Sequence, residues 1–165
     1  MRIGISCYPT HGGSGVLATE LGIELARRGH VVHFLCYNKP FRLDRLYNNV
    51  HFHRVQVNEY PLFKYPPYSL ALTSAMVDVT RHHDLQLMHA HYAIPHSVSA
   101  WMAREMLTDR KLPVVTTLHG TDITLVGNDP SYAALTEHVL VASDRVTTVS
   151  EDLARRTREN FHVLS

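Results

Sequence analysis

The sequence predicts an α/β protein built on a doubly wound, mostly parallel sheet. Apolar runs of strand length alternate along the chain with amphipathic runs of helix length. The first apolar run passes into the first amphipathic run through a turn that contains Gly12, Gly13, Ser14 and Gly15. Such alternation is typical of a parallel sheet with helices on both faces, which binds ligands beyond the carboxyl ends of its strands.

We assign each element in chain order. Strands are expected over residues 2–7, 31–37, 50–57, 85–89, 114–118 and 145–149. Helices are expected over residues 15–28, 69–82, 95–107, 131–142 and 151–161. In the first helix, the four-residue spacing of Leu17, Leu21 and Leu25 predicts the buried face, and Gly29 predicts a left-handed turn after the helix. The aromatic loop 58–68 is expected to pack on another surface.

The composition is that of one globular domain. The 165 residues are 45% hydrophobic and 19% charged, which is enough for a packed core. The 16 basic and 15 acidic residues form no basic stripe, so we expect no nucleic-acid partner. No apolar segment reaches the length of a membrane span, and a strand follows Met1 directly, which favours a cytoplasmic protein. Cys7 and Cys36 are expected to be buried and unpaired.

The turn with Gly12, Gly13, Ser14 and Gly15 predicts an anion-binding site. Glycines let the backbone approach a ligand closely, and the first N–H groups of the following helix favour negative charge. Neither the dinucleotide-binding glycine spacing nor the lysine of a P-loop is present. The alternative is a plain strand-to-helix connection in which Ser14 only caps the helix.

Two further polar segments lie at the carboxyl ends of predicted strands. They are His89-Ala90-His91-Tyr92 and Thr116-Thr117-Leu118-His119-Gly120-Thr121-Asp122. In a parallel sheet both segments would meet the glycine turn at one edge. No serine, histidine and aspartate show triad spacing, which disfavours acyl transfer. His119 leaves a strand just before a glycine and can aim its ring at a ligand, and the alternative is a turn capped by Asp122.

A metal hydrolase is a further alternative for these segments. His89 and His91 would share one face of a strand, and His119 or Asp122 could complete a zinc site. Neither a His-Glu-x-x-His motif nor a clustered cysteine and histidine set is present, so no metal site is expected. The thirteen histidines are scattered through the chain, and most are expected to be structural or exposed.

The glycine turn and the two polar segments resemble the family-4 retaining glycosyltransferases, and the resemblance covers residues 1–165. It implies a GT-B fold of two Rossmann-like domains. This chain would be the amino-terminal, acceptor-binding domain over residues 1–165, and the carboxyl-terminal sugar-nucleotide domain would be missing. The resemblance implies no cofactor and no essential metal. It also allows a homo-oligomer.

Further matches over residues 40–43, 50–53, 65–68 and 143–147 narrow the resemblance, which also includes residues 89–96, to one branch of that family. Members of this branch transfer N-acetylglucosamine from UDP-N-acetylglucosamine to L-malate in bacillithiol biosynthesis, with retention at the anomeric carbon. The resemblance implies the following substrate-binding residues: Gly12, Gly13, Ser14, Gly15, Tyr92, Thr116, Thr117 and Asp122. It implies that His119 is the catalytic residue beside the transferred sugar.

Three expectations about function therefore stand together. The first is the acceptor-binding domain of this glycosyltransferase, which should be inactive without its second domain. The second is a family-4 glycosyltransferase with another acceptor, because hydroxyls and amides at a helix start would also suit other hydroxy acids. The third is a non-catalytic domain that binds small anions.

Overall fold

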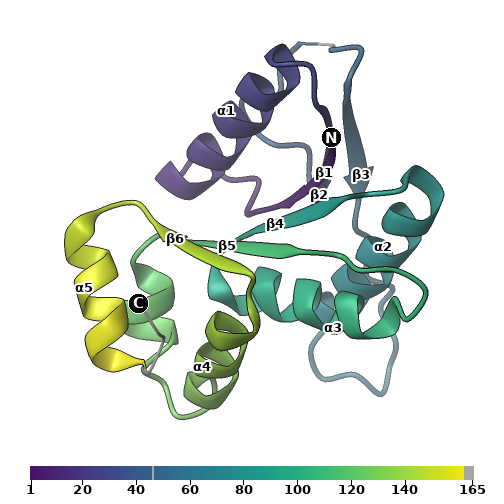
Figure 1. Ribbon diagram of the computed structural model, residues 1–165. Coiled ribbons are helices and arrows are strands. Elements are labelled where there is room, and N and C mark those ends of the chain that lie inside the picture. The colour runs from purple at the N-terminus through teal and green to yellow at the C-terminus, as the bar shows by residue number, and fades with distance from the viewer. Residues whose placement is uncertain (46, 162–165) are drawn as a thin grey trace.

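The computed structural model describes residues 1–45 and 47–161 and is organised around a six-stranded parallel sheet (Figure 1). The strands are β1 (Arg2–Ser6), β2 (Val31–Cys36), β3 (Val50–Arg54), β4 (Leu87–His91), β5 (Val114–Leu118) and β6 (Arg145–Thr148). Their order is β3-β2-β1-β4-β5-β6, and every neighbouring pair is parallel. The order reverses between β1 and β4, which is where doubly wound sheets bind ligands. The predicted fold class is confirmed, and residues 162–165 of the predicted domain lie outside the described residues.

Helices cover both faces of this sheet. They are α1 (Gly13–Arg27), α2 (Tyr68–His83), α3 (Val98–Met106), α4 (Ala133–Ala142) and α5 (Glu151–Asn160), with two short turns, η1 (Ala93–Ser97) and η2 (Asp122–Val126). Neighbouring strand residues point to opposite faces. Phe34 accordingly packs in the cluster under α1, and Leu35 packs in the cluster under α2 and α3. Among the described helices, none combines the length and the hydropathy that a membrane span needs.

The buried face of α1 differs from the predicted one. It consists of small or short side chains: Gly15, Ala18, Thr19, Gly22, Ile23 and Ala26. Leu17 is 40% exposed, and Leu21 and Leu25 are only partly buried. The small residues bring the helix so close to the sheet that a Cβ atom on Gly22 would lie 2.4 Å from Cζ of Phe34. The three leucines lie on the flank of α1 instead, because the side of the helix that faces the core consists mainly of small residues.

Several predicted element boundaries shift. β4 begins at Leu87, two residues later than expected, because α2 continues to His83 and Asp84 then adopts a left-handed conformation with φ of 49°. β3 ends at Arg54, three residues earlier than expected. The helix predicted over residues 95–107 is divided into η1 and α3, and η2 was not predicted. Gly29 has the predicted left-handed conformation, with φ of 86°.

The loop 58–68 does not pack as expected. Tyr60, Phe63 and Tyr65 are 55%, 53% and 74% exposed, and the first two rings contact each other at a centroid distance of 5.5 Å. Only Tyr68, which is also the first residue of α2, turns inward to the core cluster. The rest of the loop forms turns, with Phe63 N–H donating to the Tyr60 carbonyl oxygen at 2.9 Å.

Both cysteines follow the prediction. Cys7 and Cys36 are buried and free, with their sulfur atoms 3.7 Å apart. They come directly after the paired residues Ser6 and Leu35 of β1 and β2, so the parallel register brings them together.

Candidate functional site

A cleft of about 490 Å³ opens beyond the carboxyl ends of the central strands. Its lining residues come from the segments that follow β1, β4, β5 and β6: Tyr8, Thr10, Gly12, Gly13, Ser14, Leu17, Tyr92, His119 and Val149. The predicted meeting of the glycine turn with Tyr92 and His119 at one edge of the sheet is confirmed.

The glycine turn presents the amino end of α1 to the cleft. The N-cap residue is Gly12, no side chain caps the helix, and Ser14 already lies in its first turn. The alternative in which Ser14 only caps the helix is therefore wrong. Val16 N–H donates to the Gly12 carbonyl oxygen at 3.2 Å, so the three preceding N–H groups have no acceptor within the helix. The first turn contains no acidic residue, which leaves this end of the helix favourable for an anion.

Close backbone approach explains the last glycine of the turn. A Cβ atom on Gly15 would lie 2.5 Å from the carbonyl oxygens of both Tyr8 and Thr10. Backbone atoms cannot move aside as a flexible side chain can. Gly15 therefore lets the start of α1 pack closely against the backbone of residues 8–10. Gly12 and Gly13 line the cleft.

Tyr92 forms one wall of the cleft from an unusual backbone conformation. Its φ is 85° and its ψ is 139°, a region that costs a non-glycine residue about 1–3 kcal/mol. Its N–H donates to the Thr117 carbonyl oxygen at 2.9 Å, which holds the residue in this conformation. The ring stacks on His119 at 5.1 Å and meets the edge of Tyr8 at 5.2 Å. The Tyr92 hydroxyl lies 3.1 Å from Oγ1 of Thr121.

Asp122 organises the turn after β5 and does not line the cleft. It is 1% exposed, and its Oδ1 accepts hydrogen bonds from the N–H groups of Gly120 at 2.8 Å and His119 at 3.1 Å. Its Oδ2 accepts from Ala93 N–H at 3.4 Å. Burial raises the pKa of this carboxyl group. Both interpretations of this segment therefore hold: Asp122 caps the turn, and His119 lines the cleft.

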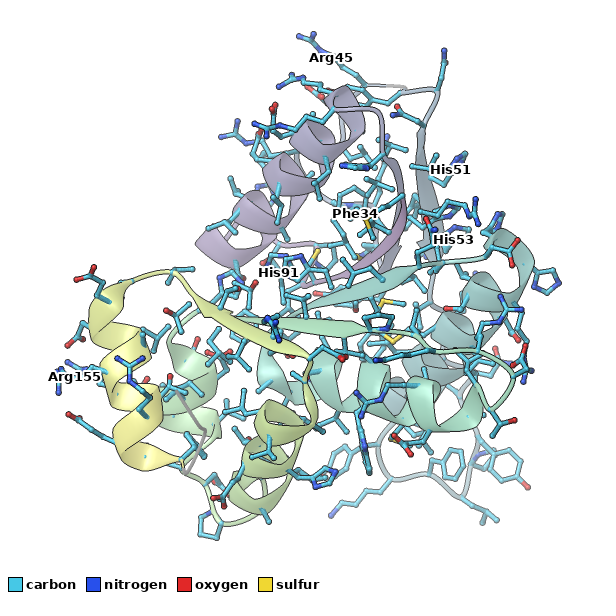
Figure 2. The ribbon with its side chains drawn as sticks, viewed as in Figure 1. Phe34, Arg45, His51, His53, His91 and Arg155 are labelled. Carbon is cyan, nitrogen blue, oxygen red and sulfur yellow. The ribbon has the colours of Figure 1, made fainter. Side chains whose placement is uncertain are left out.

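Three histidines form a chain of contacts behind the cleft. Nδ1 of His91 lies 3.0 Å from Nε2 of His119, and the rings of His89 and His91 stack at 4.4 Å (His91 is labelled in Figure 2). Nε2 of His89 lies 2.7 Å from Oγ1 of Thr117. Burial lowers the pKa of His119 and of His89 to about 4, and that of His91 well below its ordinary value. All three rings are therefore neutral near pH 7.

This chain does not have the geometry of the zinc site considered from the sequence. His89, His91 and His119 are not a group whose ligand atoms all lie within 4.8 Å of one another. The nitrogens that face each other form hydrogen bonds to one another or to Thr117.

The two predicted threonines lie under the cleft. Thr116 is fully buried, and its Oγ1 lies 2.7 Å from Ser97 Oγ and 2.8 Å from Ser143 Oγ. Thr117 is 7% exposed and bonds His89 and, at 2.7 Å, Thr147. Adjacent residues of a strand face opposite sides of the sheet, so these two hydroxyls could not both point at one ligand. Neither is among the residues that line the cleft, and both lie beneath it in this structure.

Four residues that line the cleft were not predicted: Tyr8, Thr10, Leu17 and Val149. Tyr8 and Thr10 lie between the first strand and the glycines, and their place in the sequence was sufficient to find them. Leu17 was assigned to the buried face of α1. Val149 follows the last strand, and its contribution depends on β6 lying beside β5.

The fold and the cleft define a Rossmann-like α/β domain with a ligand site beyond the carboxyl ends of its strands. Residues 11–164 match Glycosyltransferase Family 4, so the chain belongs to this family. The chain is 51% identical over 159 residues to N-acetyl-alpha-D-glucosaminyl L-malate synthase of Bacillus anthracis. That match covers 96% of this chain and 42% of the relative, so the chain spans about two fifths of the relative's length.

Solved structures share the same fold. Sucrose-phosphate synthase from Thermosynechococcus elongatus superposes with a TM-score of 0.69 at 16% identity, covering 96% of this chain and 81% of the other. A lipopolysaccharide outer core galactosyltransferase superposes with a TM-score of 0.67 at 11% identity, covering 97% of this chain and 42% of the other. These likenesses confirm the Rossmann-like architecture expected for part of a GT-B glycosyltransferase.

Proposed function

We propose that this chain is the acceptor-binding domain of a retaining glycosyltransferase. The reaction would transfer N-acetylglucosamine from UDP-N-acetylglucosamine to the hydroxyl group of L-malate. The observation that carries the proposal is the cleft, in which the amino end of α1 meets Tyr92 and His119. The name of the Bacillus anthracis relative supports malate as the acceptor. The resemblance noted from the sequence supports the nucleotide-sugar donor.

Malate carries two carboxylates, and the cleft offers donors for them. The N–H groups of Gly13 and Ser14 and the Ser14 hydroxyl would bind one carboxylate at the positive end of the α1 dipole. The exposed Thr10 hydroxyl would reach the other carboxylate from the same turn. Tyr92 would limit the width of the acceptor site, since its ring stands between Tyr8 and His119.

His119 would donate a hydrogen bond into the cleft. Nε2 of His91 is buried without a hydrogen-bond partner, and a buried N–H without an acceptor is more costly than an unpaired lone pair. The favoured arrangement therefore has the His91 proton on Nδ1, from which it is donated to Nε2 of His119. The proton of neutral His119 is then on Nδ1, which is free to donate to a hydroxyl or phosphate oxygen of the substrates.

A neutral His119 suits a reaction that needs no side-chain acid. The bond between the anomeric carbon and the UDP phosphate oxygen would break as the malate hydroxyl oxygen bonds to that carbon. The hydroxyl proton would pass to the departing phosphate. The domain would contribute orientation and fixed dipoles, with His119 touching the transferred sugar and Asp122 positioning the turn that carries it.

The remaining contacts to the donor would come from a second domain. Val149, at one rim of the cleft, is 47% exposed, so the cleft is open to water on that side. Water weakens electrostatic contacts, and we expect this chain alone to be inactive and to bind malate weakly.

The buried free cysteines Cys7 and Cys36 support a cytoplasmic location.

An amide chemical-shift titration with L-malate tests the proposal, with D-malate and succinate as controls. Saturable shifts at Gly13, Ser14, Tyr92 and His119 are expected, strongest with L-malate. Ser14→Ala should weaken binding roughly threefold to tenfold by removing one hydrogen bond to a carboxylate. Ser74→Ala is the matched control, because that exposed hydroxyl bonds only the Leu70 carbonyl of α2.

Two results would contradict the proposal. Equal shifts with succinate and L-malate would point to a general anion site instead of an acceptor site. Tight malate binding by this chain, with no transfer activity after the rest of the enzyme is supplied, would point to a non-catalytic binding domain. A preference for a different hydroxy acid would be compatible with the proposed glycosyl transfer, but the acceptor would be that acid and not L-malate.

A further inference from the structure

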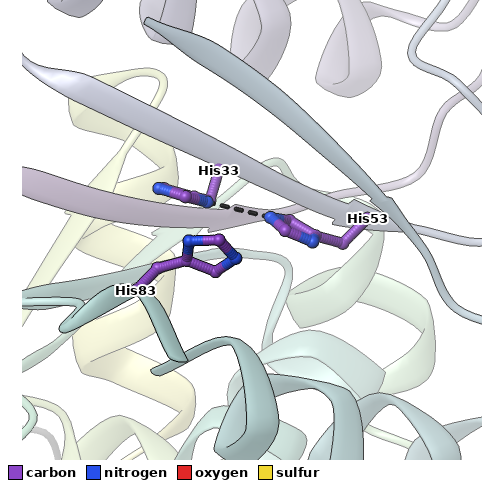
Figure 3. Close-up of side chains that lie close together, drawn as sticks. All are labelled: His33, His53 and His83. Carbon is purple, nitrogen blue, oxygen red and sulfur yellow. Dashed lines mark hydrogen bonds between the residues drawn. The ribbon is translucent and has the colours of Figure 1, made fainter. Parts of the chain in front are cut away.

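Three histidines from three different elements meet on the other side of the sheet from α1. His33 lies on β2, His53 lies on β3, and His83 is the last residue of α2 (Figure 3). Each offers one ring nitrogen, and these atoms all lie within 4.8 Å of one another. Over residues 1–45 and 47–161, this is the one group of histidine, cysteine or acidic side chains that meets this criterion.

The fold brings these rings together by register and helix length. His33 pairs with His51 across the parallel strands, and Leu35 pairs with His53, so His33 and His53 face the same side on neighbouring strands. α2 packs on this face through Leu72 and Met76 and ends over the strands at His83.

The group is separate from the candidate active site. The cluster is built from β2, the edge strand β3 and the last residue of α2. The cleft with Tyr92 and His119 lies beyond the carboxyl ends of the central strands. Figure 2 labels His53 on the edge strand β3 and His91 on the central strand β4. The proposed glycosyl transfer uses none of the three clustered histidines.

The ring nitrogens of the group lie close enough together to bind one ion. Nδ1 of His33 lies 2.8 Å from Nε2 of His53, and the His83 ring lies 4.6 Å from His33 and 5.2 Å from His53. Imidazole nitrogens are preferred ligands of zinc, copper and nickel. Tetrahedral zinc with Zn–N bonds of about 2.0–2.1 Å holds its ligand nitrogens about 3.3 Å apart, which lies between the 2.8 Å pair and the 4.8 Å limit of the group.

The three histidines differ in burial, and one side of the group is open to water, as a metal site with a water ligand requires. His33 is 2% exposed, His53 is partly buried, and His83 is exposed. The two inner rings lie on neighbouring strands, and the outer ring lies at the exposed end of α2. The exposed side leaves room for water as a fourth ligand.

We propose that His33, His53 and His83 bind a divalent transition-metal ion of the zinc class, with a water molecule as the fourth ligand. The ion would join the edge strand β3 and the end of α2 to β2. It would bind the folded state and not the unfolded chain, so it would raise the stability of the domain. This proposal does not depend on the glycosyl-transfer function.

Metal titration of the chelator-treated full chain tests the site, with ZnCl₂ followed by calorimetry and CoCl₂ followed by visible absorption. One equivalent of each ion should bind, and bound Co²⁺ should show the intense ligand-field bands of tetrahedral coordination. His83→Ala should lower the affinity at least tenfold, because it removes one of three ligands. His82→Ala is the matched control, since that exposed neighbour bonds only the Asp78 carbonyl oxygen of its own helix and should bind as the unaltered chain does.

A second variant guards against effects on folding. His53→Gln should also lose the metal, and circular dichroism without metal should match that of the unaltered chain for both ligand variants. The proposal is overturned if no stoichiometric binding occurs or if His83→Ala binds as tightly as the unaltered chain. It is also overturned if His82→Ala loses the ion equally, or if His119→Ala abolishes binding, which would place the ion in the cleft.

Discussion

The carboxylate of Asp122 joins two segments that follow different strands. It accepts hydrogen bonds from the N–H groups of His119 and Gly120 after β5 and of Ala93 after β4. Because Ala93 directly follows Tyr92, the same carboxylate fixes both walls of the cleft. The sequence indicated either a turn or a ligand site at this segment, and the structure shows that the turn is what presents His119.

Removing this carboxylate should destabilise the domain. Asp122→Ala would leave these buried N–H groups without acceptors, and we expect a loss of about 2–3 kcal/mol in the free energy of unfolding, measured with urea. Asp129→Ala is a control with one exposed hydrogen bond, to Ser131 N–H, and should lose less than about 1 kcal/mol. Equal losses in the two variants would show that Asp122 does not organise the turn.

The protonation pattern of the cleft histidines is a second prediction for single residues. Nitrogen-15 spectra of the imidazole rings near pH 7 should show His91 and His119 neutral and protonated on Nδ1, because His91 Nε2 has no buried partner. His91→Phe should remove the donor to His119 and shift its tautomer balance toward Nε2–H. Nε2–H signals for both residues in the unaltered chain would overturn the assignment of His119 as a donor into the cleft.

Sequence reasoning reached some of these residues and not others. Tyr92 and His119 follow strands directly, so a parallel sheet had to bring them to one edge. The hydrogen bonds of Thr116 to Ser97 and Ser143 depend on how η1 and the end of α4 pack, which no local pattern encodes. Strand alternation alone, in contrast, places the side chains of Thr116 and Thr117 on opposite faces of the sheet.

At the scale of elements, α1 shows how small residues set the distance between helix and sheet. Alanine at position 22 would normally favour a helix by about 1 kcal/mol over glycine. A Cβ atom there would lie 2.4 Å from Cζ of fully buried Phe34 and 3.1 Å from Cδ1 of Ile5. The close approach should outweigh helix propensity.

Gly22→Ala should therefore lower the free energy of unfolding by about 1–3 kcal/mol. Gly13→Ala is the matched helix variant, because its Cβ would meet nothing within 4 Å, and it should be neutral or slightly stabilising. Thermal and urea unfolding of both variants check the sign. If Gly22→Ala is as stable as Gly13→Ala, α1 does not approach the sheet as closely as described.

Pattern reading located most elements and misjudged one helix face. The strand over residues 114–118 was predicted at its observed bounds, since polar or proline-containing segments flank it. Leu17, Leu21 and Leu25 suggested the wrong face of α1, because hydrophobicity scales rank leucine above the glycines and alanines that contact the sheet. Exposed Leu17 instead lines the cleft.

For the whole molecule, alternation of strand and helix was enough to predict the parallel sheet and the edge at which ligands bind. It could not show that His33 on β2 meets His53 on β3, because that contact requires the strand order and register. Burial of neutral histidines is thus a property of the assembled fold. Its consequence is a stability that depends on pH.

The domain should lose stability in mild acid. His96 and His91 are fully buried, and burial lowers the pKa of His96 to about 3 and that of His91 well below its ordinary value of 6.5. Below pH 6.5 the unfolded chain binds protons at these rings and the folded chain does not, so stability present above pH 6.5 decreases as the pH falls toward the folded-state values. Each ring should contribute a slope of about 1.4 kcal/mol per pH unit in that range.

Urea unfolding between about pH 8 and pH 5 measures this slope. His96→Asn should be less stable at pH 8, because Ser6 Oγ lies 2.7 Å from Nδ1 of His96 and this bond would be weakened. The variant should nevertheless show a smaller decrease toward acid, since one titrating ring is gone. The free energy of unfolding could instead stay constant from pH 7 to pH 5. That result would mean that the buried rings accept protons within the folded domain, and it would contradict their assignment as neutral side chains.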